Sequence, residues 1–195
     1  MDTNEGGSDE SVVAAVLGGE RDRYAVLVAR YQRRIYGALW RMCGNSYDAE
    51  ELTQVTFVRA YFALGSYKPA YKFSTWLFQI AFHLYLNEKR KHRRELEMSS
   101  LSAGDDTPTI EAADPDALPG TVVEARETQG AIWRAVASLP EDFRQVIIMR
   151  HVEELSYHEI CEATGLPIGT VKSRLARARQ QLARLLSEEA EDEPR

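Results

Sequence analysis

A proline-containing acidic stretch near the middle of the chain limits the possible folds more than any other feature of the sequence. Residues 99–127 contain seven acidic residues against one basic residue, with three prolines among serine, threonine, glycine and alanine. The stretch shows no apolar period, which is typical of a flexible linker. We therefore expect a linker over residues 98–127 and two small domains, one on each side of it.

The apolar residues on both sides of this linker recur at helical spacing. Ile35, Leu39 and Met42 follow one another at i, i+4 and i+7, and Gly44 is expected to end their helix. No segment alternates apolar and polar residues with enough β-branched side chains to predict a strand. The predicted fold class is all-α, with two small helical domains joined by a flexible acidic linker.

Two further helices are predicted before the linker. Asp48 is expected to cap the first of them and Gly65 to end it. Its apolar stripe is predicted to be Leu52, Val55, Val58 and Phe62. The other helix is expected to have Ser74 or Thr75 as its cap. Its predicted stripe is Trp76, Leu77, Ile80, Ala81 and Leu84, and it runs into a cluster of five cations within residues 89–94.

The second half of the chain carries stronger local signals. Residues 122–137 are predicted to be helical, and Pro140 is expected to be the first residue of the next helix. Ser156 and Glu159 have the spacing of a capping box, and Gly165 is expected to end the short helix that the box opens. A final helix is predicted over residues 168–186. Two helices joined by a tight glycine turn, the second of them basic, form a helix-turn-helix pattern.

The final helix separates an apolar face from a cationic one. At 100° per residue, four apolar side chains fall within about 40° of Val171; they are Leu175, Ala178, Leu182 and Leu185. The opposite side carries Thr170, Ser173, Arg177 and Arg184, flanked by Lys172, Arg174 and Arg179. Such a helix fits the major groove of DNA, where arginine and lysine bind guanine edges or phosphates. The alternative is the solvated basic face of an ordinary helix.

An aromatic-rich region precedes the cation cluster of residues 89–94. Its members are Tyr61, Phe62, Tyr67, Tyr71, Phe73, Trp76, Phe82 and Tyr85. Aromatic rings beside cations hold unstacked bases of single-stranded nucleic acid. The alternative is that most of these rings, Phe62 and Trp76 especially, belong to the core.

Charge and composition exclude several classes of protein. With 24 basic and 30 acidic residues the chain has a net charge of -6, so it is not a globally basic nucleic-acid binder, although it contains two basic blocks. The acidic ends are expected to be solvated and disordered. His158 and Cys161 have a spacing that supplies two metal ligands, but no second pair is near. We expect no metal, no cofactor, no catalytic activity, no small-molecule substrate and no membrane insertion, and we expect a cytoplasmic protein.

Two sets of motifs resemble a known family. DAEELTQ (residues 48–54), Phe57 and FSTWLFQIA (residues 73–81) resemble region 2 of bacterial sigma factors of the extracytoplasmic-function (ECF) group. LPE (residues 139–141), Arg144, LSYHEI (residues 155–160) and GTVKSRLARAR (residues 169–179) resemble region 4 of the same group. The resemblance covers about residues 24–186, and the linker lies where the family has one.

This resemblance implies a transcription initiation subunit. Its expected organisation is an acidic N-terminal segment (1–20), region 2 (21–97), the linker (98–127), region 4 (128–186) and an acidic tail (187–195). The implied partners are core RNA polymerase, through the clamp coiled coil of its β' subunit and the flap of its β subunit, and promoter DNA. The family is often held inactive by an anti-sigma factor inserted between the two domains, so we expect such a partner here.

The resemblance also implies three sets of contact residues. Core polymerase is expected to bind Asp48, Glu51, Leu52 and Gln54, with Leu52 partly exposed. Region 2 is expected to melt the −10 promoter element and capture one strand with Tyr67, Lys72, Ser74, Trp76, His83, Asn87 and Arg90. Region 4 is expected to read the −35 element as duplex DNA with Thr170, Lys172, Ser173, Arg174 and Arg177.

The sequence departs from the family pattern at the promoter-facing helix. The family usually has Asn at His83 and Asp at Asn87, so the preference for a −10 sequence is open; Glu51 in place of Asp is a milder change. Two other classes are weighed. A stand-alone helix-turn-helix regulator would bind duplex DNA without polymerase, but would have no reason to carry the motifs of residues 48–57 and 73–81. A helical adaptor that binds only protein conflicts with the acid-free basic helix of residues 170–186.

Overall fold

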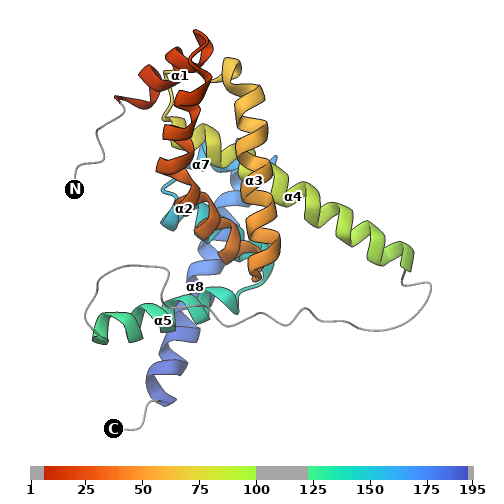
Figure 1. Cartoon of the computed structure of the whole chain (residues 1–195). Coiled ribbons are helices and arrows are strands. Elements are labelled where there is room, and N and C mark those ends of the chain that lie inside the picture. Colours follow the sequence, from red (N-terminus) through yellow and green to blue (C-terminus); the bar gives the residue numbers. More distant parts are fainter. Residues whose placement is uncertain (1–6, 100–122, 193–195) are drawn as a thin grey trace. The chain divides into compact units, whose positions relative to one another are not determined.

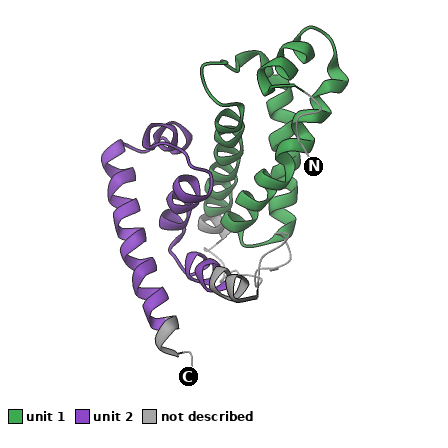
Figure 2. Cartoon of the chain, turned by 90° about the vertical axis from the view of Figure 1, so that its left-hand side faces the viewer, with its two compact units in different colours: residues 1–104 green, residues 105–195 purple. Residues whose placement is uncertain are grey.

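The computed structural model describes residues 7–99 and 123–192 of the chain. The chain divides into two compact units, residues 1–104 and residues 105–195 (Figure 2). Within the described residues every regular element is helical and no strand occurs, which confirms the predicted all-α class. None of the helices in these ranges is long and apolar enough to cross a membrane.

Unit 1 is a bundle of α-helices with two short 3-10 helices in its connections (Figure 1). The α-helices are α1 (Asp9–Leu17), α2 (Tyr24–Cys43), α3 (Ser46–Ala63) and α4 (Phe73–Ser99). The 3-10 helices are η1 (Arg21–Arg23) and η2 (Leu64–Ser66). α2, α3 and α4 pack on one another, and the stripe of Ile35, Leu39 and Met42 is buried between them as predicted. Gly44 ends α2 with a φ of 77°, a left-handed conformation that glycine adopts without strain.

Unit 2 places three helices around the long α8. Its elements are α5 (Val123–Ala137), α6 (Glu141–Ile147), a π-helical turn (Ile148–Val152), α7 (Tyr157–Thr164) and α8 (Ile168–Asp192). α5, α6 and α7 all contact α8. The core includes Leu139, Ile148, Ile160 and Val171, each at most 1% exposed. The predicted capping box of Ser156 and Glu159 is present, and Gly165 ends α7 with a φ of 72°, so both local predictions are confirmed.

The predicted apolar stripe of α3 is wrong. Leu52 is buried, but Val58 is 57% exposed and Phe62 82% exposed, so Phe62 is not part of the core. The face turned inward instead carries small side chains and two threonines. The buried residues are Ala49, Leu52, Thr53, Thr56, Phe57 and Ala60. The threonine hydroxyls donate to the carbonyl oxygens of Ala49 and Leu52, each at 2.6 Å, so they lose no hydrogen bond on burial.

Several predicted helix boundaries are also wrong by a few residues. Asn45, not Asp48, caps α3: its side-chain oxygen accepts from the Asp48 N–H at 2.8 Å. α4 begins at Phe73, so neither Ser74 nor Thr75 is its cap, and Thr75 is buried. Gly65 does not end α3, because the chain passes from Ala63 directly into η2. Pro140 occupies the cap position of α6, so the helix begins at Glu141, one residue after the expected start.

The described part of the N-terminal acidic segment forms a packed helix, contrary to the expectation of a solvated, disordered end. Ser8 caps α1, which then buries Val12, Val13 and Val16. α1 packs against α2 and both 3-10 helices of unit 1. The acidic residues at its start favour the helix because its N-terminal end carries a partial positive charge.

Two helices extend further than predicted. α4 reaches Ser99, beyond the expected end of region 2 at residue 97, and so enters the expected linker of residues 98–127. α5 begins at Val123, also inside that range, in agreement with the helix predicted over residues 122–137. α8 continues to Asp192, through most of the expected acidic tail. Residues 100–122 lie outside the described residues. They include most of the linker and Val122, the predicted first residue of a helix.

Candidate nucleic-acid and polymerase interfaces

α8 presents a cationic face to solvent. Val171, Leu175 and Ala178 are at most 1% exposed and lie against the rest of unit 2, as the rotation of the helix predicts. On the other side Lys172, Ser173 and Arg177 are exposed, and Thr170 is half-buried. This face follows the turn at Gly165, so α7 and α8 form a helix-turn-helix with the polar side of its second helix open to solvent. Four of the five residues expected to read duplex DNA are therefore brought together.

Arg174 has a different environment from these four residues. Its Nη2 atom lies 2.7 Å from Oδ2 of Asp142, and only 25% of its side chain is exposed. The ion pair ties α8 to the first turn of α6, where Asp142 also favours the N-terminal end of that helix. In this arrangement Arg174 holds the helix-turn-helix in place rather than extending toward solvent.

A histidine that sequence reasoning missed lies beside the cationic face. Arg179 donates a hydrogen bond from Nε to Nε2 of His151 over 3.3 Å. Burial, together with the positive charges of Arg179 and Arg150, lowers the pKa of His151. His151 is in the π-helical turn, 28 residues from Arg179 along the chain, so no local signal in the sequence joins them.

The lowered pKa of His151 predicts a pH dependence of stability. Because the unfolded chain binds the proton more readily, unit 2 is most stable above the ordinary histidine value of about 6.5 and loses stability as the pH falls below it. We expect the unfolding temperature of the protein to fall more between pH 7.5 and pH 5.5 than that of a His151→Gln variant. A His158→Gln variant is the control, and equal pH slopes for all three proteins would contradict the prediction.

α4 carries the second candidate nucleic-acid surface. His83, Asn87 and Arg90 are exposed and recur at i, i+4 and i+7, so they share one side of the helix. Lys72 is exposed just before the helix, while Ser74 and Trp76 are half-buried in its first turn. Five of these six residues therefore lie on α4, and Lys72 directly precedes it.

Tyr67 does not join that set. It is 7% exposed, and its hydroxyl donates to the carbonyl oxygen of Tyr71 at 2.8 Å. Its ring lies at 5.4 Å from that of Phe73 and at 5.7 Å from that of Trp76. Tyr71, a member of the aromatic-rich region but not of the expected −10 contacts, is 59% exposed in the same turn. The structure therefore buries Tyr67, which was expected to contact DNA, and leaves Tyr71 exposed to solvent.

α3 carries the candidate polymerase surface. Asp48, Glu51 and Gln54 are exposed, and Asp48 also accepts a hydrogen bond from the side-chain amide of Asn45 at 2.9 Å. Leu52, expected to be partly exposed, is 8% exposed and packs in the core. The apolar part of this surface comes instead from residues that sequence reasoning placed in the core or did not select. They are Tyr47, Val58 and Phe62, with exposed fractions of 77%, 57% and 82%.

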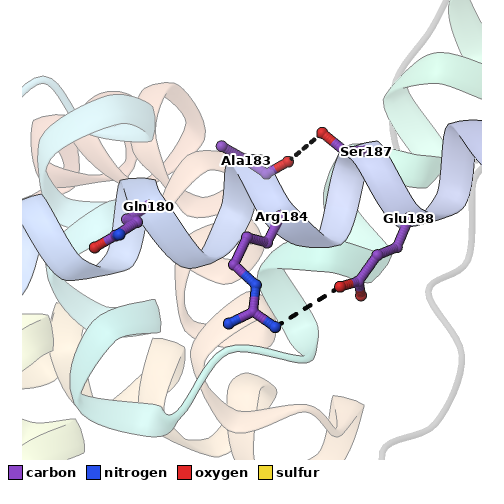
Figure 3. A pocket seen from close by; sticks show the side chains of 5 residues that line it. All are labelled: Gln180, Ala183, Arg184, Ser187 and Glu188. Atoms are coloured by element: carbon purple, nitrogen blue, oxygen red, sulfur yellow. Dashed lines mark hydrogen bonds and ion pairs between the residues drawn. The ribbon is translucent and has the colours of Figure 1, made fainter.

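Elsewhere on α8 the side chains bond mainly to their own helix. Figure 3 shows a shallow depression along its C-terminal half, where Arg184 pairs with Glu188 at 3.7 Å and Ser187 donates to the Ala183 carbonyl at 2.8 Å. No group of three or more metal-ligating side chains occurs in the described part of the chain, and His158 and Cys161 have no such partners there.

Comparison with known proteins identifies the class. Residues 27–95 match the family Sigma-70 region 2, and residues 129–182 match the family Sigma-70, region 4. The chain belongs to the ECF family of RNA polymerase sigma factors. Sigma factors are transcription initiation factors without catalytic activity, so the chain is not an enzyme.

Individual relatives agree with this assignment. The chain is 34% identical over 176 residues to the ECF RNA polymerase sigma factor SigW of Bacillus subtilis, covering 89% of this chain and 94% of that protein. It is 34% identical over 190 residues to ECF sigma factor SigE of Mycolicibacterium smegmatis, covering 95% and 72%. The sigma factor RpoE of Bartonella quintana, solved with the anti-sigma factor NepR, has a TM-score of 0.63 at 25% identity, covering 82% and 94%. These relatives favour the sigma factor over a stand-alone regulator.

Proposed function

We propose that this chain binds core RNA polymerase through the exposed face of α3 and directs it to promoters with α4 and α8. The observation that carries the proposal is the presence of both sigma regions in one chain, each with an exposed polar or cationic face. The functional domains would be region 2 over residues 21–97 and region 4 over residues 128–186. Transcription takes place in the cytoplasm of bacteria, so we place the chain there.

Unit 2 would read the −35 element as duplex DNA. The exposure of Lys172, Ser173 and Arg177 on one side of α8 supports this role, because guanidinium and ammonium groups bind guanine edges and phosphates in the major groove. Thr170 would contact the DNA backbone near the start of α8, because the N-terminal end of a helix attracts phosphate. Arg174 would act indirectly, by holding α8 against α6 through Asp142.

Unit 1 would melt the −10 element and capture one strand. Lys72, His83, Asn87 and Arg90 are exposed along α4 and its preceding turn, which suits contact with a phosphate backbone. Trp76 and Ser74 are half-buried at the start of the helix, close enough to the surface to contact an unstacked base. We add Tyr71 to this surface because its side chain is exposed in the turn before α4.

Core polymerase would bind α3 through a mixed polar and apolar face. Glu51, Val58 and Phe62 fall within about 40° of one another on a helical projection, and Gln54 and Asp48 flank them. An exposed aromatic ring on the same side of a helix as carboxylates and an amide is typical of a protein-binding surface. The flap of the polymerase β subunit would bind unit 2.

An anti-sigma factor is a further expected partner, because the Bartonella quintana relative was solved in complex with one.

Run-off transcription with purified core polymerase on a library of promoter fragments tests the proposal. We expect initiation at specific sequences only when the chain is added, and its loss when Gln54 is replaced by alanine. Asp22→Ala, at an exposed position of η1 that is not among the expected contact residues, is the matched control and is expected to initiate normally. Binding to duplex DNA without binding to core polymerase would overturn the proposal and leave a stand-alone regulator.

A further inference from the structure

α1 packs beside the turn that leads into α4. It contacts η2, the 3-10 helix from which residues 66–72 begin, and it buries Val12, Val13 and Val16 in unit 1. Figure 1 shows α1 at the end of unit 1 where α3 passes through this turn into α4. Because the turn contains the exposed Tyr71 and Lys72, a helix fixed at its base is placed to control where those two side chains lie.

Asp9 fastens α1 to α2. One carboxylate oxygen accepts a hydrogen bond from Nη1 of Arg30 at 2.8 Å, and the other accepts one from the hydroxyl of Tyr31. Arg30 also donates from Nη2 to the carbonyl oxygen of Gly7 at 2.7 Å. The side chains of Asp9 and Arg30 are 20% and 19% exposed, so these charge-assisted bonds are largely shielded from solvent.

Tyr31 connects this contact to the turn through a series of aromatic rings. Its ring centroid lies 5.6 Å from that of Phe73, the first residue of α4, which is 1% exposed. Phe73 in turn lies 5.4 Å from Tyr67 and 5.5 Å from Trp76. Tyr67 then donates its hydroxyl to the carbonyl oxygen of Tyr71. These contacts connect both the Tyr67 side and the Phe73 side of the turn to the ring of Tyr31, whose hydroxyl bonds to Asp9.

The electrostatics of Tyr67 agree with this geometry. Burial raises its pKa, and the negative charges of Glu10 and Asp9 raise the pKa further. Both carboxylates belong to the first turn of α1, so this turn lies near enough to Tyr67 for its negative charges to affect the pKa of the hydroxyl.

We propose that Asp9 and Tyr31 are positioning residues for the capture of the single-stranded −10 element. They fix the turn of residues 66–72 so that Tyr71 and Lys72 face the unpaired base. The inference rests on the proposed function of unit 1 and extends it to a helix that lies before the region 2 family match, which begins at residue 27. Tyr67 acts through the turn it supports rather than by touching DNA.

Base preference measured with the full chain bound to core polymerase tests this inference. The variants are Asp9→Ala and Tyr31→Phe; the second removes only the hydroxyl and leaves the ring packed on Phe73. Asp22→Asn, which removes an exposed carboxylate of η1, is the charge-matched control. Initiation is counted on promoter libraries randomised at the −10 or the −35 element, and affinity for core polymerase is measured alongside.

Losing a charge-assisted hydrogen bond is expected to lower the −10 base preference of both variants by about tenfold. Their −35 preference and core affinity should stay within about twofold of the unsubstituted protein, as both should for Asp22→Asn. Unchanged −10 preference in both variants would overturn the inference and leave the proposed function standing. A parallel fall in −10 preference, −35 preference and core affinity would also overturn it, since that is the result of general destabilisation. Absence of sequence-specific initiation by the unsubstituted chain would overturn the proposed function, and the inference with it.

Discussion

Replacing Arg177 with alanine is expected to weaken binding of the polymerase complex to its −35 element by about 10- to 100-fold, the range expected for loss of a good arginine contact to a base. Arg177 is exposed at the middle of the cationic face of α8, with Ser173 one turn before it. The loss is measured by fluorescence anisotropy of a labelled promoter duplex, using the full chain assembled with core polymerase.

Arg184→Ala is the matched control for this variant. Seven residues separate the two arginines, so they share one side of α8 but lie about 10 Å apart along it. Arg184 pairs with Glu188 on the exposed part of the helix shown in Figure 3. We expect its replacement to change binding by less than about twofold, because exposed ion pairs contribute little. Equal losses from the two variants would show that α8 attracts DNA by charge alone and does not read a sequence.

The salt dependence of the Arg177→Ala variant separates two kinds of contact. If Arg177 binds a base edge, discrimination falls at one position of the −35 element and the salt dependence is nearly unchanged. If it binds a phosphate, affinity falls equally for all sequences and the slope of log K against log salt decreases by about one. Measuring both quantities therefore assigns the contact.

Replacing Arg144 with alanine is expected to destabilise unit 2 by about 2 kcal/mol, within the range for hydrogen bonds that involve a charged group. Its Nη2 atom donates to the carbonyl oxygens of Ala137 at 2.7 Å and Leu139 at 3.1 Å. Ala137 is the last residue of α5, where carbonyl groups have no partner within the helix and attract cations. Arg144 therefore joins the end of α5 to α6 and is a structural residue, although it belongs to the motifs that resemble region 4.

Hydrogen–deuterium exchange is the suitable measurement, because it reports each unit separately. A loss of about 2 kcal/mol should speed exchange of the slowest amides in unit 2 by about 30-fold and leave unit 1 unchanged. Arg144→Lys keeps the charge but loses the planar fork, so its effect should be intermediate. Unchanged exchange in Arg144→Ala would mean that the two carbonyl groups find equivalent partners without the guanidinium.

Local signals in the sequence predicted the ends and faces of several helices correctly. Gly44 and Gly165 end α2 and α7, and Ser156 with Glu159 forms the capping box of α7. Each of these features depends on hydrogen bonds and dihedral angles within a few residues, which the local sequence specifies. The split of α8 into a buried and a cationic face follows equally from its own period.

Longer-range contacts explain the predictions that were wrong. α3 offered two apolar surfaces, and its period did not show that small residues and self-bonded threonines would face α2 and α4 while Phe62 stayed in solvent. Tyr67 and Tyr71 look equivalent in the sequence, but only Tyr67 meets Phe73 and Trp76. The acidic N-terminal segment was expected to be disordered because it is polar and acidic. The partners of Asp9, which are Arg30 and Tyr31, are more than twenty residues away, so the local sequence does not reveal them.

The sequence by itself determined that this chain is all-α, that it is a sigma factor of the ECF group, and which side of α8 is cationic. Helical periods, capping residues and motifs are properties of neighbouring residues, so they can be recognised from the sequence alone. Only the tertiary structure decided which arginine of α8 is held by Asp142, which face of α3 stays exposed, and that α1 supports the turn before α4. These outcomes depend on which distant segments meet, since burial and ion pairing are settled by the neighbour that each side chain acquires when the chain folds.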